Sequence, residues 1–216
     1  MNPSRSSATT LLYLVRHGAT DSNVSRPYVL QGRSVDKPLN EIGRKQAKAV
    51  GAFLSTERLA GVYSSSMHRA AETGLQVAKH HGLVVEQFDD LCECDVGAWE
   101  SMDWDSIMRE HPQEYGAFME NPAENPYLGG ESYGDVLNRA RPVVADLLER
   151  HVGEAIAVVA HNVVNRVLLA DFLGLEPRKA KDLHQSNACV NVIRRRDGTT
   201  SLVTLNSYFH LDESLR

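Results

Sequence analysis

Two histidines that each follow an apolar run are candidates for covalent chemistry. Arg16 and His17 come directly after residues 11–15, and His161 comes directly after residues 155–160. Apolar runs of this length are typical of buried strands, and open α/β sheets bind their ligands at the carboxyl ends of the strands. A neutral imidazole with one nitrogen held as a donor can attack as a nucleophile, and a guanidinium recognises oxyanions. The pattern therefore predicts a nucleophile beside an anion site.

A second arginine and a glutamate stand at two further strand ends. Arg69 lies in the first turn of a predicted helix after a strand at residues 62–63, and Glu93 follows a predicted strand at residues 83–87. Two guanidiniums and helix N-termini favour a phosphate, and a carboxyl group can protonate its leaving oxygen. Each residue alone has an ordinary explanation; Arg69, for example, could pair with Glu72 on its own helix. Four matching placements instead favour one phosphoryl-transfer site.

The elements that position these side chains alternate between strands and helices. This order predicts an α/β fold, a three-layer αβα sandwich with a mainly parallel central sheet. The first strand is predicted at residues 11–16, helices near 40–56, 67–81, 132–151 and 163–174, and a final antiparallel pair at 189–195 and 201–206. Pro142 lies inside one of these helices and is expected to kink or split it.

The segment from residue 96 to residue 130 differs from the rest of the chain, because three prolines and scattered aromatic residues interrupt it. This composition is typical of an excursion over a sheet edge, and we expect an inserted lid over the carboxyl ends of the strands. Residues 1–10 are polar and rich in serine, which indicates a flexible N-terminal tail. Residues 11–216 have the length of a single domain.

Composition restricts the class of partner and the compartment. The net charge of −5 does not favour a nucleic acid or an anionic membrane, and no segment has the length of a membrane span. The N-terminus lacks the pattern of a secretory signal. Three cysteines, Cys92, Cys94 and Cys189, form no evident disulfide framework or metal clip, which favours packing roles in a reducing compartment. We expect a cytoplasmic protein, and the sequence leaves a homodimer open.

Several sequence blocks, taken together, resemble the histidine phosphatase superfamily, which includes the cofactor-dependent phosphoglycerate mutases and many small-molecule phosphatases. The matching blocks are residues 14–23, 31–32, 38–47, 63–65 with 68–73, Glu93 with 97–100, 129–132 and 159–161. They follow the order of the family from near residue 12 to near residue 172, and are therefore very specific.

The resemblance implies a role for each candidate residue. His17 would form a transient phosphohistidine, and Glu93 would serve as general acid and then general base. The phosphoryl group would be held by Arg16, Arg69 and His161, with Asn23 assisting. The implied substrate is a small-molecule phosphoester, and no metal or organic cofactor is expected.

The chain departs from the family pattern at three places. Asn162 stands where a glycine usually follows the second histidine. As a helix cap it should preserve activity, and its amide could add a donor to the pocket and narrow the range of substrates. The spacing from Asn23 to residues 31–32 is longer than in many members, and Ser101 replaces a common glycine.

Three functions remain to be separated: a phosphomonoesterase, a phosphoglycerate mutase and an inactive phosphate-binding or scaffold protein. A mutase must hold a second anionic group, yet residues 96–130 contain seven acidic residues, and Arg109 is their only lysine or arginine. Most of these acids are expected to face solvent, while Trp99, Trp104, Met108, Tyr115 and Phe118 point inward as packing. The scarcity of basic side chains in the lid favours hydrolysis over a mutase reaction. The presence of all five central site residues argues against an inactive protein; they are Arg16, His17, Arg69, Glu93 and His161.

Overall fold

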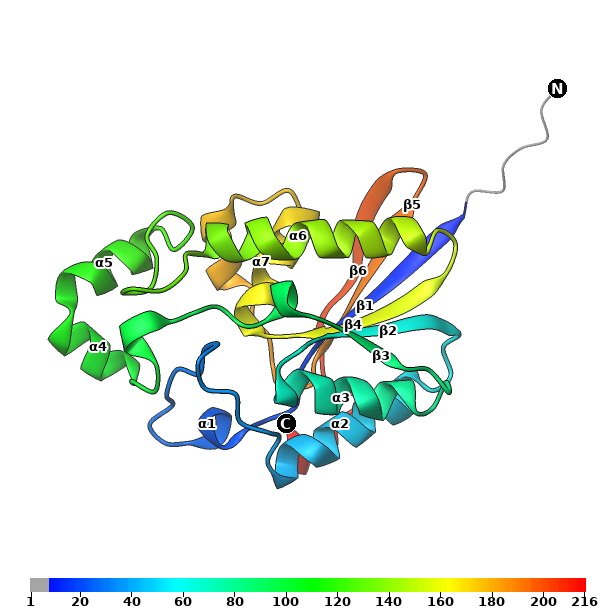
Figure 1. Ribbon diagram of the computed structural model, residues 1–216, viewed down its shortest axis with the longest axis horizontal. Coiled ribbons are helices and arrows are strands. Elements are labelled where there is room, and N and C mark those ends of the chain that lie inside the picture. The colour runs from blue at the N-terminus through cyan, green and yellow to red at the C-terminus, as the bar shows by residue number, and fades with distance from the viewer. Residues whose placement is uncertain (1–7) are drawn as a thin grey trace.

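A six-stranded sheet in the order β3-β2-β4-β1-β5-β6 forms the centre of the molecule (Figure 1). The computed structural model describes residues 8–216. The strands are β1 (Thr9–Arg16), β2 (Leu59–Ser65), β3 (Val85–Phe88), β4 (Ala155–Ala160), β5 (Val190–Arg196) and β6 (Thr199–Ser207). The first four run parallel, and β5 pairs antiparallel with both β1 and β6. The predicted, mainly parallel sheet is confirmed.

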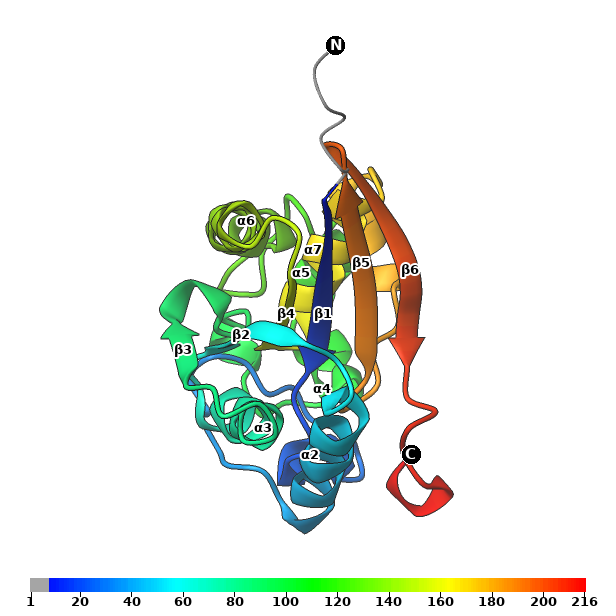
Figure 2. The same cartoon turned by 90° about the vertical axis from the view of Figure 1, so that its right-hand side faces the viewer.

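Helices cover both faces of this sheet. They are α1 (Asp21–Val24), α2 (Glu41–Leu54), α3 (His68–Ala78), α4 (Trp104–Glu110), α5 (Pro112–Glu120), α6 (Tyr133–Arg150) and α7 (Asn162–Phe172). Figures 1 and 2 show α6 and α7 on one face and α2 and α3 on the other, which confirms the three-layer sandwich. No helix in the described part of the chain combines the length and apolar character needed to cross a bilayer.

The side chains of β1 alternate between the hydrophobic cores on the two faces of the sheet. Leu12 and Leu14 pack into the core beneath α6 and α7, whereas Tyr13 and Val15 pack into the core beneath α2 and α3. A strand buried on both faces needs a nearly continuous apolar sequence, which is what residues 11–15 supply. The strand that carries Arg16 and His17 to the site is therefore held from both sides.

Several element boundaries differ from the predicted ones. β1 begins at Thr9 because the Thr10 hydroxyl donates to the carbonyl oxygen of His151 and accepts from Gly153 N–H. Polar residues 9 and 10 thus belong to the sheet rather than to the predicted tail, and residues 1–7 lie outside the described part. The helix after β2 ends at Ala78 instead of 81, before Gly82 turns with φ +66°.

Pro142 does not split α6, which is one helix from Tyr133 to Arg150. A proline removes one N–H from the helical ladder and leaves the carbonyl four residues earlier without its usual partner. Pro142 lies on the exposed face of the helix, where water can solvate that carbonyl. The helix tolerates proline at this position for that reason.

The segment predicted as a lid contains α4 and α5 and contributes to the hydrophobic core. Trp99 is fully buried and packs edge-to-face against Phe118 and Tyr127, with ring centroids 5.8 Å away in each case. Phe118 also contacts Tyr133 of α6, so the aromatic cluster joins the lid to the main body. Met108 is 49% exposed, and its predicted inward orientation is wrong. Figure 1 shows α4 and α5 extending beyond the sheet at one end.

The loop after β1 lies directly on α2. A Cβ atom on Gly18 would collide with the carbonyl of Gly43, and a Cβ on Gly43 would collide with the backbone of Ala19. Both glycines are therefore required by close approach of the two backbones. Their contact fixes the loop that follows His17.

Candidate active site

His17 is held by hydrogen bonds from three directions. Its N–H donates to the carbonyl of Ala160 (3.1 Å), and its carbonyl accepts from Ala188 N–H (3.0 Å). Its ring Nδ1 lies 2.6 Å from the Gly18 carbonyl oxygen. Because a carbonyl only accepts, Nδ1 carries the proton and Nε2 keeps its lone pair. The structure thus holds the tautomer that a nucleophilic histidine requires.

Arg16 and His161 flank this imidazole. The rings of His17 and His161 lie with centroids 5.1 Å apart, and both are buried. Arg16 donates through Nη1 to the carbonyl of Gln185 (2.6 Å), which orients the guanidinium. Arg16 Nε and both ring nitrogens of His161 are buried without a hydrogen-bond partner in the described chain. Unpartnered buried polar atoms are costly, so these groups fit a site made to receive a ligand.

Arg69 enters from the first turn of α3 and is almost fully buried. Its Nη1 and Nη2 donate to the carbonyls of Val35 (3.1 Å) and Gly32 (3.0 Å), while Nε has no partner in the described residues. The alternative pairing with Glu72 is not observed, because Glu72 faces Arg44 instead. The long loop after α1 therefore serves to orient Arg69.

Glu93 lies in the segment that follows β3, and its side chain contacts the start of α7. Its Oε1 accepts from Cys94 N–H (2.9 Å), and both carboxylate oxygens lie near Val163 N–H, at 3.2 and 3.3 Å. These backbone N–H groups hold the carboxyl group in place. The carboxylate is buried and has a fixed orientation toward the site.

Arg139 of α6 clamps the backbone that carries Glu93. Its guanidinium donates to the carbonyls of Cys92 (2.7 Å) and Glu93 (3.1 Å) and forms a two-point pair with Glu131 at 2.8 and 2.9 Å. Glu131 in turn accepts from Asp95 N–H (2.8 Å). One arginine–carboxylate pair thus fixes the segment on both sides of the candidate acid.

These groups surround two adjoining cavities. The smaller, of about 30 Å³, is lined by Arg16, His17, Asn23, Glu93 and Asn162 among others. The larger, of about 260 Å³, shares Arg16 and Asn162 with it and extends under Trp104 of the lid. Arg69 and His161 do not line the smaller cavity but lie buried beside it. The arrangement suits a phosphoryl group in the small cavity and its substituent in the larger one.

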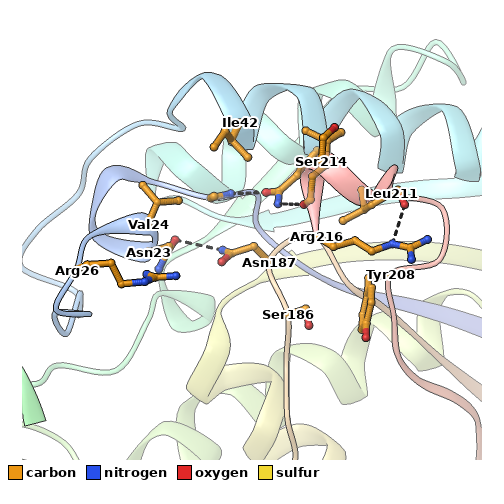
Figure 3. A pocket seen from close by; sticks show the side chains of 13 residues that line it. Asn23, Val24, Arg26, Ile42, Ser186, Asn187, Tyr208, Leu211, Ser214 and Arg216 are labelled. Carbon is orange, nitrogen blue, oxygen red and sulfur yellow. Dashed lines mark hydrogen bonds between the residues drawn. The ribbon is translucent and has the colours of Figure 1, made fainter.

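Asn23 and Asn187 form part of the wall of this site. Asn187 Nδ2 donates to Asn23 Oδ1 (3.1 Å), as Figure 3 shows, and Asn23 also accepts from the backbone N–H of Thr20 (3.0 Å). A separate hollow of about 330 Å³ adjoins the same pair and is bordered by Tyr208 and Arg216 near the C-terminus. The hydrogen bond between the two asparagines therefore lies between the two adjoining cavities and this hollow.

Burial and nearby positive charge hold both site histidines neutral. Burial is the largest cause of the lowered pKa of His17, which lies well below its ordinary value near 6.5; the charges of Arg69 and Arg16 lower it further. The pKa of His161 is lowered well below 6.5 by burial first and then by the same arginine charges. A neutral imidazole is the form in which His17 can attack.

The lowered pKa values predict that the protein loses stability as pH falls below about 6.5. In that range the unfolded histidines bind protons that the folded ones do not, so the free energy of unfolding falls until the folded-state pKa is reached. The slope is up to about 1.4 kcal/mol per pH unit for each histidine. His161→Gln should make this slope shallower. The measurement is the free energy of unfolding from urea titrations at pH 7.5 and 5.5.

His80→Gln is the matched control for this measurement, because His80 is exposed on the surface. Burial also lowers the pKa of His210, so His161→Gln should reduce the pH dependence of stability without removing it. Identical slopes in the wild type and His161→Gln would contradict the prediction.

Asn162 was expected to be the N-cap of α7, and that expectation is wrong. His161 is the N-cap of α7, with extended backbone and no side-chain capping bond, and Asn162 is the first helical residue. The Asn162 side chain lines both cavities, and its Oδ1 is buried without a partner in the described chain. The predicted contribution to the pocket thus stays a proposal, while the capping role belongs to the backbone of His161.

Sequence reasoning missed the residues that support the site from elsewhere in the chain. Gln185 orients Arg16, Arg139 clamps the Glu93 segment, and Arg166 of α7 lines the larger cavity. Arg139 follows the block at residues 129–132 by two helical turns, a spacing that could have indicated it. No local pattern marks Gln185, because its contact spans 169 residues.

The chain is similar to known proteins over nearly its whole length. The family model "Histidine phosphatase superfamily (branch 1)" matches residues 12–208. Phosphoserine phosphatase 1 of Hydrogenobacter thermophilus is 33% identical over 94% of each chain. The metal-independent phosphoserine phosphatase of Arabidopsis thaliana is 33% identical over 95% of this chain and 84% of the relative. The structure of Bacillus stearothermophilus YhfR superposes with a TM-score of 0.85 at 32% identity, covering 94% of this chain and all of that one.

Proposed function

Because the chain belongs to the histidine phosphatase superfamily (branch 1), we propose that it is a phosphomonoesterase that hydrolyses small-molecule phosphate esters through a phosphohistidine on His17. Glu93 acts as general acid and then as general base. Arg16, Arg69 and His161 hold the phosphoryl group, and Asn23 and Asn162 complete the pocket. Phosphatases among the relatives support the reaction class.

One observation carries the proposal: the hydrogen bond from His17 Nδ1 to the Gly18 carbonyl. It leaves the Nε2 lone pair as the reactive atom of a buried ring, whose lowered pKa keeps it unprotonated. The nearby Arg16 and Arg69 neutralise the phosphate and the charge that grows on its equatorial oxygens. An imidazole with both features is suited to attack phosphorus.

In the first step His17 Nε2 forms a bond to phosphorus, and the bond from phosphorus to the ester oxygen breaks. Glu93 enters this step protonated and gives its proton to the departing oxygen. In the second step a water attacks the phosphohistidine, and the Glu93 carboxylate takes the proton of that water. Phosphate leaves, and His17 and Glu93 return to their starting states.

The residues present also support a reaction without a metal ion. Two guanidiniums and the α7 N-terminus supply the positive electrostatic environment that a phosphoryl transition state requires, and the neutral ring of His161 adds a hydrogen-bond donor. One relative is named a metal-independent phosphoserine phosphatase. The same proposal treats residues 11–216 as one catalytic domain, and its three buried free cysteines suit a reducing, cytoplasmic setting.

Phosphate release from a panel of phosphoesters, including p-nitrophenyl phosphate, tests the proposed function. Release is expected with EDTA present and without stimulation by a bisphosphoglycerate. Dependence on a bisphosphoglycerate, with isomerised phosphoglycerate as product, would identify a mutase. Absence of turnover on every ester would identify an inactive phosphate-binding protein.

Arg139 is expected to act as a positioning residue for Glu93. Arg139→Gln removes the donors to the Cys92 and Glu93 carbonyls and should lower kcat on alkyl phosphates by about 10². Aryl phosphates, whose leaving groups need little protonation, should lose less. The measurement is kcat for both ester types, with the melting temperature recorded alongside.

Arg141→Gln provides the matched control, because Arg141 lies on the same helix and pairs with Asp171 at the surface. It should leave both rates unchanged. Equal losses of Arg139→Gln on alkyl and aryl esters would instead indicate a general structural role for Arg139.

A further inference from the structure

The larger catalytic cavity is cationic and has no acidic lining residue. It measures about 260 Å³, and Arg16 and Arg166 line it together with His184 and the aromatic rings of Trp104 and Tyr127. No aspartate or glutamate of the described chain contributes to its wall. Two guanidiniums facing one small volume favour an anionic occupant.

Arg166 is positioned for a ligand by its own helix. It follows Asn162 by four residues, so both side chains project from the same face of α7 and line the same cavity. Its Nε donates to the carbonyl of Leu183 (2.9 Å), which anchors one edge of the guanidinium. Among residues 8–216 no carboxylate lies within 4.0 Å of its nitrogens. The charge of Arg166 is thus anchored but not neutralised.

The charge of Arg166 also acts on its surroundings. It lowers the pKa of Arg16, in addition to the larger effect of burial, and it opposes the effect of burial that raises the pKa of Tyr133. Arg166 is therefore near both groups, and the two like charges destabilise each other while the cavity holds no anion. A second anion beside the phosphoryl group would relieve this repulsion.

Resting on the phosphomonoesterase proposed above, we propose that Arg166 binds a carboxylate on the leaving group of the substrate. The substrate class is then a small phosphorylated hydroxy acid or amino acid. A single unneutralised guanidinium matches one carboxylate charge, whereas a second phosphate dianion would need two. The cavity lies at the lower end of the size of small-molecule sites, about 300 Å³, and adjoins the phosphoryl pocket, so few carbon atoms separate the two anions.

The test compares pairs of esters that differ only in the carboxylate. Phosphoserine is paired with phosphoethanolamine, and 3-phosphoglycerate with glycerol 3-phosphate. The wild type is expected to show a kcat/KM about 10- to 100-fold higher for the acid of at least one pair, the range for a hydrogen bond to a charged group. If the wild type hydrolyses p-nitrophenyl phosphate but shows no preference for the carboxylate-bearing ester in either pair, the carboxylate assignment is overturned and the proposed function stays intact. No turnover of any ester would refute the proposed function itself.

Variants assign the preference to the residue. Arg166→Gln should abolish the acid preference, because it lowers kcat/KM for the acid of a pair about 10- to 100-fold more than for its partner without the carboxylate. Arg166→Lys should keep part of the preference. Arg178→Gln is the control, since Arg178 is exposed and pairs with Glu176. Retention of the full preference in Arg166→Gln would overturn the assignment. Equal loss on every ester would show that Arg166 only supports the fold of the site.

Discussion

His17→Ala is expected to lose turnover by at least about 10⁴-fold on every ester, because it removes the atom that forms the covalent intermediate. Water alone would then have to attack a phosphate whose charge is held by Arg16 and Arg69. The variant should also fail to retain labelled phosphate after rapid quenching, whereas the wild type should give an acid-labile, base-stable phosphoenzyme. Steady-state phosphate release and quenched labelling measure the two effects.

His80→Ala is the matched control, since it deletes an exposed imidazole distant from the cavities. It should keep both turnover and the labelled intermediate. Undiminished labelling of His17→Ala would move the nucleophile to another side chain. Far-ultraviolet circular dichroism establishes that both variants fold.

Glu93→Gln is expected to separate esters by their leaving group. Alkyl phosphates need a proton on the departing oxygen and should slow by about 10² to 10⁴, the usual contribution of general acid–base catalysis. Aryl phosphates should slow far less in the first step. The amide still accepts from the N–H of Cys94 and Val163, so the backbone arrangement around it should survive.

A plot of log kcat/KM against the pKa of the leaving group measures this effect, because kcat/KM reports the first step, and its slope should be steeper in Glu93→Gln than in the wild type. Glu114→Gln, on the exposed face of α5, supplies the control and should follow the wild-type line. Parallel lines for the wild type and Glu93→Gln would remove Glu93 from the role of general acid.

The parts of the fold and site that depend on local patterns could be predicted. Residues 11–15 and 155–160 are apolar because both strands are buried on both faces, and that property alone locates the sheet centre. His17 and His161 follow directly, because adjacent parallel strands end at one edge of the sheet. The antiparallel pair of β5 and β6 could also be predicted, because an Asp-Gly turn joins the two strands.

The contacts made across long sequence separations could not be predicted. Residues 96–130 contribute Trp104 to the wall of the larger cavity, whereas the arginine that faces it there, Arg166, comes from α7. The scarcity of base in the lid therefore does not distinguish hydrolysis from a mutase reaction. The contact of Arg139 with the Glu93 segment was missed for a similar reason, since the carbonyls of Cys92 and Glu93 lie more than 40 residues away on a segment without regular structure.

The position of β1 in the sheet has a consequence for the time at which the enzyme becomes active during its synthesis. β1 precedes the other five strands of this sheet along the chain, yet its neighbours are β4 and β5, and its Leu14 carbonyl accepts a hydrogen bond from Asn191, 177 residues later. Chains generally fold as whole domains, and contacts of such separation form late. His17, the proposed nucleophile, is thus synthesised before β2 to β6 and gains its surroundings only after β4 and β5 have been made. Prematurely terminated chains that lack β5 would carry His17 without a site around it, and so would not consume phosphoesters.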